Sequence, residues 1–246
     1  MDSITSLDGT KIAFERAGEG PPIIFVTGAF NDRSTCAPLA RLLETRFTVI
    51  TYDRRGRGDS GDTLPYAVAR EAEDLAALIA EAGGSAFVFG FSSGARLALK
   101  ATGATKFALY EPSYENEPQT ALIAEISTLI AEGRRGDAVE AFQIKAIGLP
   151  PQMVTQVRQS PYFPALEAMA HTLVYDLTIT GEPVIEPACA PALVLSGAET
   201  WEALTEAAKT VAGQLGARHR IVPGGAHHQI DPEVVAPVLA DWFTAE

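Results

Sequence analysis

The stretch Ala86-Phe87-Val88-Phe89-Gly90-Phe91-Ser92-Ser93-Gly94-Ala95-Arg96-Leu97 decides the fold. Its apolar first part predicts a short buried strand, and its last part predicts a helix. A Gly-x-Ser-x-Gly turn between strand and helix forces the serine onto a sharp bend with an exposed hydroxyl. The two glycines have no Cβ atom, so strand and helix can approach closely. We therefore predict that Ser92 is a nucleophile and that the N–H of Ser93, at the helix N-terminus, faces an oxyanion. The alternative is a structural turn of small residues.

Composition narrows the class of protein. The chain has 246 residues and is 47% hydrophobic, which suits one sizeable α/β domain with an insertion. A net charge of −12 argues against nucleic acid and anionic membrane surfaces as partners. Cys36 and Cys189 lack metal-site spacing, so we expect reduced, buried thiols in a cytoplasmic protein. Residues Met1–Ile4 lack a basic region, so we expect no signal peptide, and no apolar run approaches a membrane span.

The first half of the chain alternates between strand and helix patterns. Residues 3–7 and 11–16 predict a hairpin around an Asp8-Gly9 turn. Further strands are predicted at 22–27, 47–52, 86–89 and 106–110, with helices between them. This βαβ rhythm predicts a parallel sheet with helices on both faces, an α/β fold.

The rhythm changes after Glu111. Up to about Pro187 the chain shows only helical stripes and proline breaks, which predict a helical insertion over the carboxyl edge of the sheet. Strands return at 192–196 and 218–222, with helices at 201–215 and 232–244. We therefore assign residues 1–111 and 187–246 to the core and residues 112–186 to a helical cap.

This order of parts resembles the α/β-hydrolase superfamily, and its small capped bacterial esterase-like members in particular. The resemblance rests on the serine turn, on Thr27-Gly28-Ala29, on the loop Tyr52–Ser60 and on the loop Pro223–His228. It implies a three-layer fold with a mostly parallel eight-stranded sheet and a cap between strands six and seven. Many members have His-Gly where this chain has Thr27-Gly28, but the oxyanion donor implied there is the backbone N–H of Ala29.

A serine nucleophile needs a base within hydrogen-bond reach. His227 and His228 lie in the loop where a base would approach the end of the sheet. The resemblance to loops ending Pro-Gly-x-x-His favours His227, and His228 stays open as the alternative.

The base in turn needs a carboxylate. Many members of the superfamily carry an aspartate where this chain has Thr200, so the identity of the acid is open, and either of two glutamates or neither could take the role. Glu111 follows the sixth strand, where some members place their acid, and Glu199 follows the seventh. We favour Glu111, because the proline after it holds it extended, and Glu199 remains the alternative.

The run Arg54-Arg55-Gly56-Arg57 could bind phosphate or nucleic acid. Because Asp53 and Asp59 flank it and the chain is acidic, we favour internal salt bridges that hold this loop.

We therefore predict a cytoplasmic serine hydrolase that acts on an ester-like acyl bond of a small-molecule substrate, without a cofactor or metal. We expect no nucleic-acid or membrane partner and leave a homodimer open. One alternative is a non-hydrolytic ligand-binding sensor on the same fold. Another keeps the triad but breaks a lactone or C–C bond.

Overall fold

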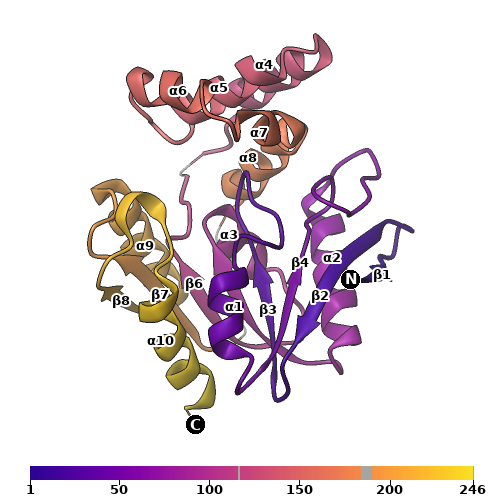
Figure 1. Ribbon diagram of the computed structural model, residues 1–246, viewed down its shortest axis with the longest axis vertical. Coiled ribbons are helices and arrows are strands. Elements are labelled where there is room, and N and C mark those ends of the chain that lie inside the picture. The colour runs from indigo at the N-terminus through magenta and orange to yellow at the C-terminus, as the bar shows by residue number, and fades with distance from the viewer. Residues whose placement is uncertain (116, 184–189, 246) are drawn as a thin grey trace. The chain divides into compact units, whose positions relative to one another are not determined.

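A computed structural model describes residues 1–115, 117–183 and 190–245 of the chain (Figure 1). The chain forms two compact units. The core unit comprises Met1–Tyr114 and Pro183–Glu246, and the helical unit comprises Glu115–Glu182. The predicted boundary at residues 186 and 187, like Cys189, lies outside the described residues. Within those ranges every helix is too short or too polar to span a lipid bilayer.

One eight-stranded sheet organises the core unit, in the order β1-β2-β4-β3-β5-β6-β7-β8. The antiparallel strands β1 and β2 occupy one end, and the six other strands run parallel to one another. This confirms the predicted α/β-hydrolase sheet. The strands are β1 Asp2–Thr5, β2 Lys11–Ala17, β3 Pro22–Val26, β4 Thr48–Tyr52, β5 Ala86–Phe91, β6 Ala104–Tyr110, β7 Ala192–Gly197 and β8 Arg218–Val222.

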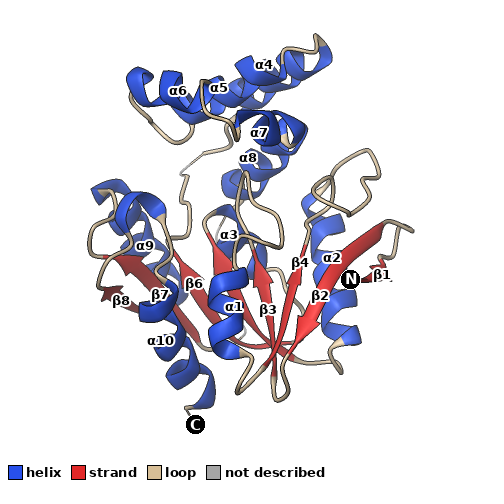
Figure 2. Cartoon of the chain, in the orientation of Figure 1, coloured by secondary structure: helices blue, strands red, loops and turns tan. Residues whose placement is uncertain are grey.

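Helices cover both faces of this sheet (Figure 2). Right-handed crossovers place α2, α3 and α9 on one face and α1 on the other, where α10 packs against α1. The face with α1 and α10 holds a continuous cluster of buried side chains that includes Phe25, Leu39, Phe89 and Leu239. The core helices are α1 Ala37–Leu43, α2 Val68–Glu81, α3 Ser93–Ala98, α9 Glu202–Leu215 and α10 Pro232–Thr244.

Local signals set the ends of the last two core helices. Helix α9 ends at Gly216, which has a left-handed φ of 62°. Helix α10 begins after Asp231, whose side chain accepts a bond from the Glu233 N–H at 3.2 Å, and Pro232 occupies the first turn. The predicted range of α10 is therefore confirmed.

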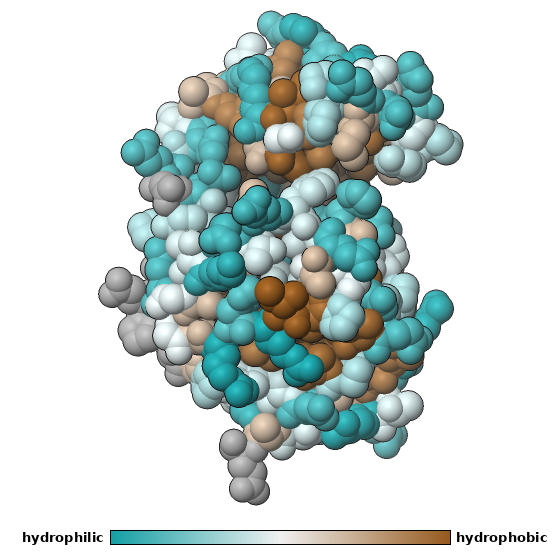
Figure 3. Space-filling model, turned by 90° about the vertical axis from the view of Figure 1, so that its left-hand side faces the viewer, coloured by the Kyte–Doolittle hydropathy of each residue, from teal (hydrophilic) through white to brown (hydrophobic). Residues whose placement is uncertain are grey.

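Strand β8 is one edge of the sheet, on the side of the core unit that Figure 3 shows. An apolar patch there is bounded by hydrophilic residues. Ile221 on this strand is 52% exposed, and Arg218 and Arg220, which are also exposed, flank the partly covered His219. Charged side chains on an edge strand discourage pairing with another sheet.

The helical unit contains α4 Thr120–Ala131, α5 Arg135–Lys145, α6 Pro151–Arg158, α7 Phe163–Ala168, η1 Ala170–Thr172 and α8 Leu173–Gly181. Helix α5 contacts α4, α6 and α7. Its core includes the fully buried Ile126, Val139 and Leu173. The described residues of this unit include no strand, in line with the helical character predicted for the insertion. That the unit covers the edge of the sheet stays a prediction.

Candidate active site

Ser92 occupies the turn between β5 and α3, in the strained conformation that its sequence setting predicts. Its φ and ψ are 57° and −129°, and it is partly exposed. A Cβ atom on Gly90 would lie 2.5 Å from Ala95 Cα, and one on Gly94 would lie 2.4 Å from the Thr27 carbonyl oxygen. Both positions therefore require glycine, as the sequence predicts.

Glu111 directly follows β6 and lies against His228. Its φ of 44° is left-handed, so the prediction that the proline after it holds it extended is wrong. Its carboxylate is fully buried, and its Oε2 lies 2.5 Å from His228 Nδ1. Its Oε1 accepts the backbone N–H of Gly197, at the end of β7, at 2.9 Å. Because an ionised carboxylate only accepts hydrogen bonds, the contact assigns the proton to Nδ1. Nε2 is then the ring nitrogen that can take up a proton.

The other two candidates for base and acid lie differently. His227, which the sequence interpretation preferred as the base, is exposed, whereas His228 is about four-fifths covered, with 21% of its side chain accessible. Glu199 is also exposed, and its backbone N–H donates to Gly224 O at 3.0 Å. The geometry thus favours His228 over His227 and Glu111 over Glu199.

Two contacts of Tyr110 tie the histidine loop to the serine turn. Its carbonyl oxygen accepts the Ser92 N–H at 3.0 Å, and its hydroxyl donates to Gln229 O at 3.0 Å. Burial, with a contribution from Glu111, raises the pKa of this phenol, so it remains a hydrogen-bond donor at neutral pH. A Cβ atom on Gly225 would lie 2.4 Å from the Tyr110 hydroxyl, so the loop packs directly on it.

Backbone strain gathers at this site. Among the described residues other than glycine, five have a positive φ: Phe30, Ser92, Glu111, His227 and His228. All five belong to the serine turn, the end of β6, the histidine loop or the loop after β3. Such conformations cost about 1–3 kcal/mol each and persist where the surroundings over-determine them, typically at functional sites.

The loop after β3 lies against the serine, as an oxyanion loop must. A Cβ atom on Gly28 would lie 2.7 Å from Ser92 Cβ and 3.2 Å from Ser92 Oγ. Ala29, the donor implied by the resemblance, follows directly, and Ser93 begins α3 beside the nucleophile. The structure therefore places Gly28, the residue before Ala29, against Ser92, which Ser93 follows in the chain.

Two contacts at the site were not foreseen from the sequence. The Ser92 hydroxyl lies 3.3 Å from the hydroxyl of Ser113. In the described part of the chain, Ser92 therefore forms its side-chain hydrogen bond with Ser113 and not with His228. The His228 ring also lies near two aromatic rings, with the centroid of Phe91 4.7 Å away and that of Trp201 6.5 Å away. Of these contacts, only that between Phe91 and the His228 ring has a signal in the sequence, because Phe91 lies inside the serine motif next to Ser92.

The arginine run is internal, as predicted. Arg54, Arg55 and Arg57 are each no more than 1% exposed. Asp53 and Asp59, the predicted partners, both pair with Arg33, which the prediction did not include. An isolated buried guanidinium would be costly, so these side chains must be hydrogen-bonded.

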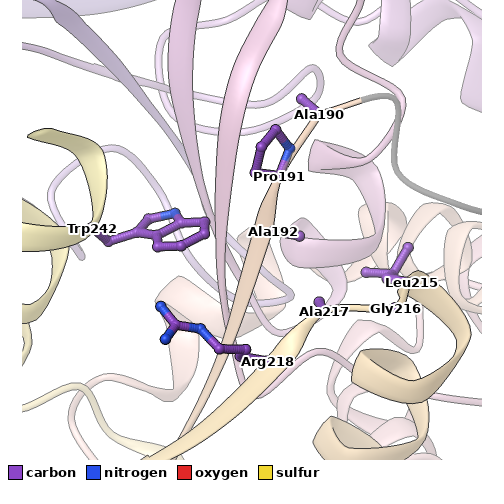
Figure 4. A pocket seen from close by; sticks show the side chains of 8 residues that line it. All are labelled: Ala190, Pro191, Ala192, Leu215, Gly216, Ala217, Arg218 and Trp242. Carbon is purple, nitrogen blue, oxygen red and sulfur yellow. The ribbon is translucent and has the colours of Figure 1, made fainter. Parts of the chain in front are cut away.

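A pocket of about 410 Å³ lies away from Ser92, Glu111 and His228. Figure 4 shows the residues that line it. It is lined at the starts of β7 and β8, with Trp242 and Leu215 on opposite sides of the strand that carries Ala192. Because these strands are parallel, it lies at the opposite end of the sheet from Glu111 and Gly197. No group of three or more His, Cys, Asp or Glu side chains that could hold a metal occurs in the described residues.

Comparisons with known proteins identify the family and the fold. A family model described as "Alpha/beta hydrolase family" matches residues 23–238. The chain is 28% identical to the 2-(acetamidomethylene)succinate hydrolase of Mesorhizobium japonicum, over 93% of this chain and 90% of that protein. It is 36% identical to a protein named Uncharacterized hydrolase YraK of Bacillus subtilis, over only 37% of this chain and 35% of that protein. A crystal structure of an alpha/beta hydrolase from Sphaerobacter thermophilus superposes with a TM-score of 0.91 at 44% identity, covering 99% of this chain and 100% of that one.

Proposed function

The chain belongs to the alpha/beta hydrolase family, and from that premise we propose that it is a serine hydrolase that cleaves an ester-like acyl bond of a small molecule. The proposed triad is Ser92, His228 and Glu111. The observation that carries it is the 2.5 Å contact between Glu111 Oε2 and His228 Nδ1. A carboxylate in that position holds the imidazole in one tautomer and stabilises the imidazolium that forms during catalysis.

In the proposed mechanism, Ser92 Oγ attacks the acyl carbon while His228 Nε2 takes the hydroxyl proton. The negative charge that develops on the acyl oxygen is stabilised by the N–H groups of Ala29 and Ser93. His228 then returns the proton to the leaving group, and water repeats the sequence to release the acid. Catalytic hydrogen bonds are often long or misaligned without substrate, so the contact between Ser92 and Ser113 is compatible with this mechanism.

From the relatives we propose only a broad substrate class, a small molecule with an acyl bond. The Mesorhizobium relative is named for the hydrolysis of 2-(acetamidomethylene)succinate, and at 28% identity we carry over only hydrolysis of a small molecule. Lactone and C–C bond cleavage use the same nucleophile and remain the alternatives for the reaction.

Hydrolysis of a short p-nitrophenyl ester by single-residue variants tests this proposal. We expect Ser92→Ala and His228→Ala to lose at least about 10³-fold in kcat, as expected for triad members. Two matched controls should retain wild-type kcat: His227→Ala, which removes the adjacent exposed histidine, and Ser127→Ala, on α4. Full turnover by Ser92→Ala would reject the proposal and favour the ligand-binding alternative.

A further inference from the structure

Three neighbouring arginines after β4 are buried, and their hydrogen bonds divide into two groups. The first group anchors the side chains to α2 and the N-terminal hairpin. Arg54 Nε and Nη2 each donate to Glu71 at 2.7 Å, and Arg55 donates to Asp74 at 2.8 and 2.7 Å and to Asp8 at 2.9 Å. Bidentate pairing of this kind offsets the cost of burying a guanidinium and fixes its plane.

The second group reaches the loop after β3. Arg54 Nη1 donates to the Thr27 carbonyl at 3.2 Å. Arg57 Nη1 donates to the Gly28 carbonyl and, at 3.4 Å, to that of Asn31. The Asn31 side chain in turn donates to the Ala29 carbonyl at 2.6 Å. Four carbonyl groups of one short loop are thus held by side-chain donors.

The Arg57 bond has a geometric consequence. The Gly28 carbonyl and the Ala29 N–H belong to the same peptide group, which is planar and trans. A side chain that fixes the direction of that carbonyl therefore also fixes the direction of the Ala29 N–H, which lies in the same plane and points the opposite way. A bond to the carbonyl oxygen also polarises the peptide and strengthens its N–H as a donor.

We propose that Arg57 is a positioning residue of the oxyanion hole. Through its bond to the Gly28 carbonyl, Arg57 aims the Ala29 N–H at the developing oxyanion. The inference rests on the proposed serine hydrolase function. The loop needs such support, because Phe30 has a φ of 60° and Gly28 leaves no room for a Cβ atom beside Ser92. A strained loop keeps one conformation only where its surroundings hold it.

The matched control is Arg55, which is as buried as Arg57 and lies two residues away. Its bonds go to Asp8, Asp74 and the Arg70 carbonyl, not to the loop after β3. Arg57→Lys and Arg55→Lys both keep the charge and remove the planar fork. Both variants should lose stability, but only the first should disturb the oxyanion hole.

The experiment measures kcat and KM for p-nitrophenyl acetate and the Ki of phenylboronic acid, which forms a tetrahedral adduct with an active serine. Rates are normalised to the folded fraction. For Arg57→Lys we expect kcat to fall about 10- to 100-fold, below the loss of an entire oxyanion donor. The boronate Ki should rise by a similar factor and KM should change less than about twofold, because the donor acts on the tetrahedral state. Arg55→Lys should leave all three near wild-type values.

Two results would overturn the inference. One is an Arg57→Lys variant whose kcat and boronate Ki match those of Arg55→Lys, and the other is a loss confined to KM. Arg57→Met serves as the second variant if the lysine side chain restores the bond to Gly28, and it should show the larger loss of kcat. Failure of the proposed function itself is distinguishable, because the wild-type protein would then neither hydrolyse the ester nor bind the boronate.

Discussion

Glu111→Gln isolates the charge of the proposed triad acid while keeping its shape. In the structure, the Glu111 carboxylate accepts from Gly197 N–H through Oε1 and from His228 Nδ1–H through Oε2. A glutamine can keep the first bond with its amide oxygen. Its NH₂ group then faces Nδ1 and favours the tautomer that carries its proton on Nε2, which cannot act as a base.

The expected magnitude follows from that change of tautomer. Replacing a triad acid by its amide lowers kcat by about 10⁴-fold, which corresponds to about 5 kcal/mol of transition-state stabilisation. KM for a short p-nitrophenyl ester should change little, because the substrate does not touch Glu111 in the proposed mechanism. The free energy of unfolding should stay close to that of the wild type, because the bond to Gly197 is kept.

Steady-state hydrolysis and urea denaturation together test this prediction, with Glu199→Gln as the matched control. Glu199 is exposed, so its amide variant should keep wild-type kcat within about twofold. A large loss in Glu199→Gln with full turnover in Glu111→Gln would transfer the acid to Glu199. Unchanged rates in both variants would refute the assignment of either carboxylate.

Three further predictions concern the surroundings of the triad and the fold. Ser113→Ala should raise the rate at which a fluorophosphonate labels Ser92 by about threefold, because the lost contact of 3.3 Å holds the resting hydroxyl by about 0.5–1.5 kcal/mol; a slower reaction would contradict this. Gly28→Ala should lower kcat at least about 100-fold in the folded protein, because the new Cβ would displace Ser92, and wild-type turnover would show that the loop yields freely. Asp8→Asn should lower the free energy of unfolding at pH 7 by about 1.5–3 kcal/mol, because its bond to Arg55 holds the pKa of Asp8 below its ordinary value. A group with a lowered folded-state pKa stabilises above its unfolded pKa, so this difference should shrink as the pH falls below the ordinary value of 3.8, and a pH-independent difference in urea denaturation would count against the bond.

The fold was predictable from the sequence because its signals are local. The serine motif joins a strand and a helix directly, and strand β8 and helix α10 have the predicted bounds. Apolar runs and helical stripes report burial within a few residues, so the parallel sheet and the helical insertion follow from them.

The partners within the site were less predictable, because they depend on backbone turns and on long-range contacts. His227 and His228 are adjacent and both have a left-handed φ, of 53° and 66°. Such a turn leaves no regular side-chain pattern from which the ring that meets Glu111 could be read. The sequence predicts that Asp53 and Asp59, in the same loop, pair with the arginine run, yet the carboxylates that pair with Arg54 and Arg55 include Glu71 and Asp74 of α2. Two carboxylates three residues apart lie on the same face of a helix, so α2 can pair with both arginines at once. This pairing depends on how α2 packs and cannot be seen from residues adjacent in the sequence.

Some predictions concern properties that a single chain does not display. The cytoplasmic location, a homodimer, the lack of nucleic-acid or membrane partners and the cofactor-free reaction stay predictions.

Cys36 is buried and free, as expected, and burial raises the pKa of its thiol to about 12.

Covalent labelling with a fluorophosphonate, followed by peptide mapping, tests the central claim most directly, because it asks whether Ser92 is activated without assuming a substrate. The account predicts one adduct per wild-type chain, located on Ser92. It predicts no adduct on Ser92→Ala and at least about 10³-fold slower labelling of His228→Ala, which lacks the base. An unlabelled wild-type protein, or an adduct on another serine that persists in Ser92→Ala, would contradict the account.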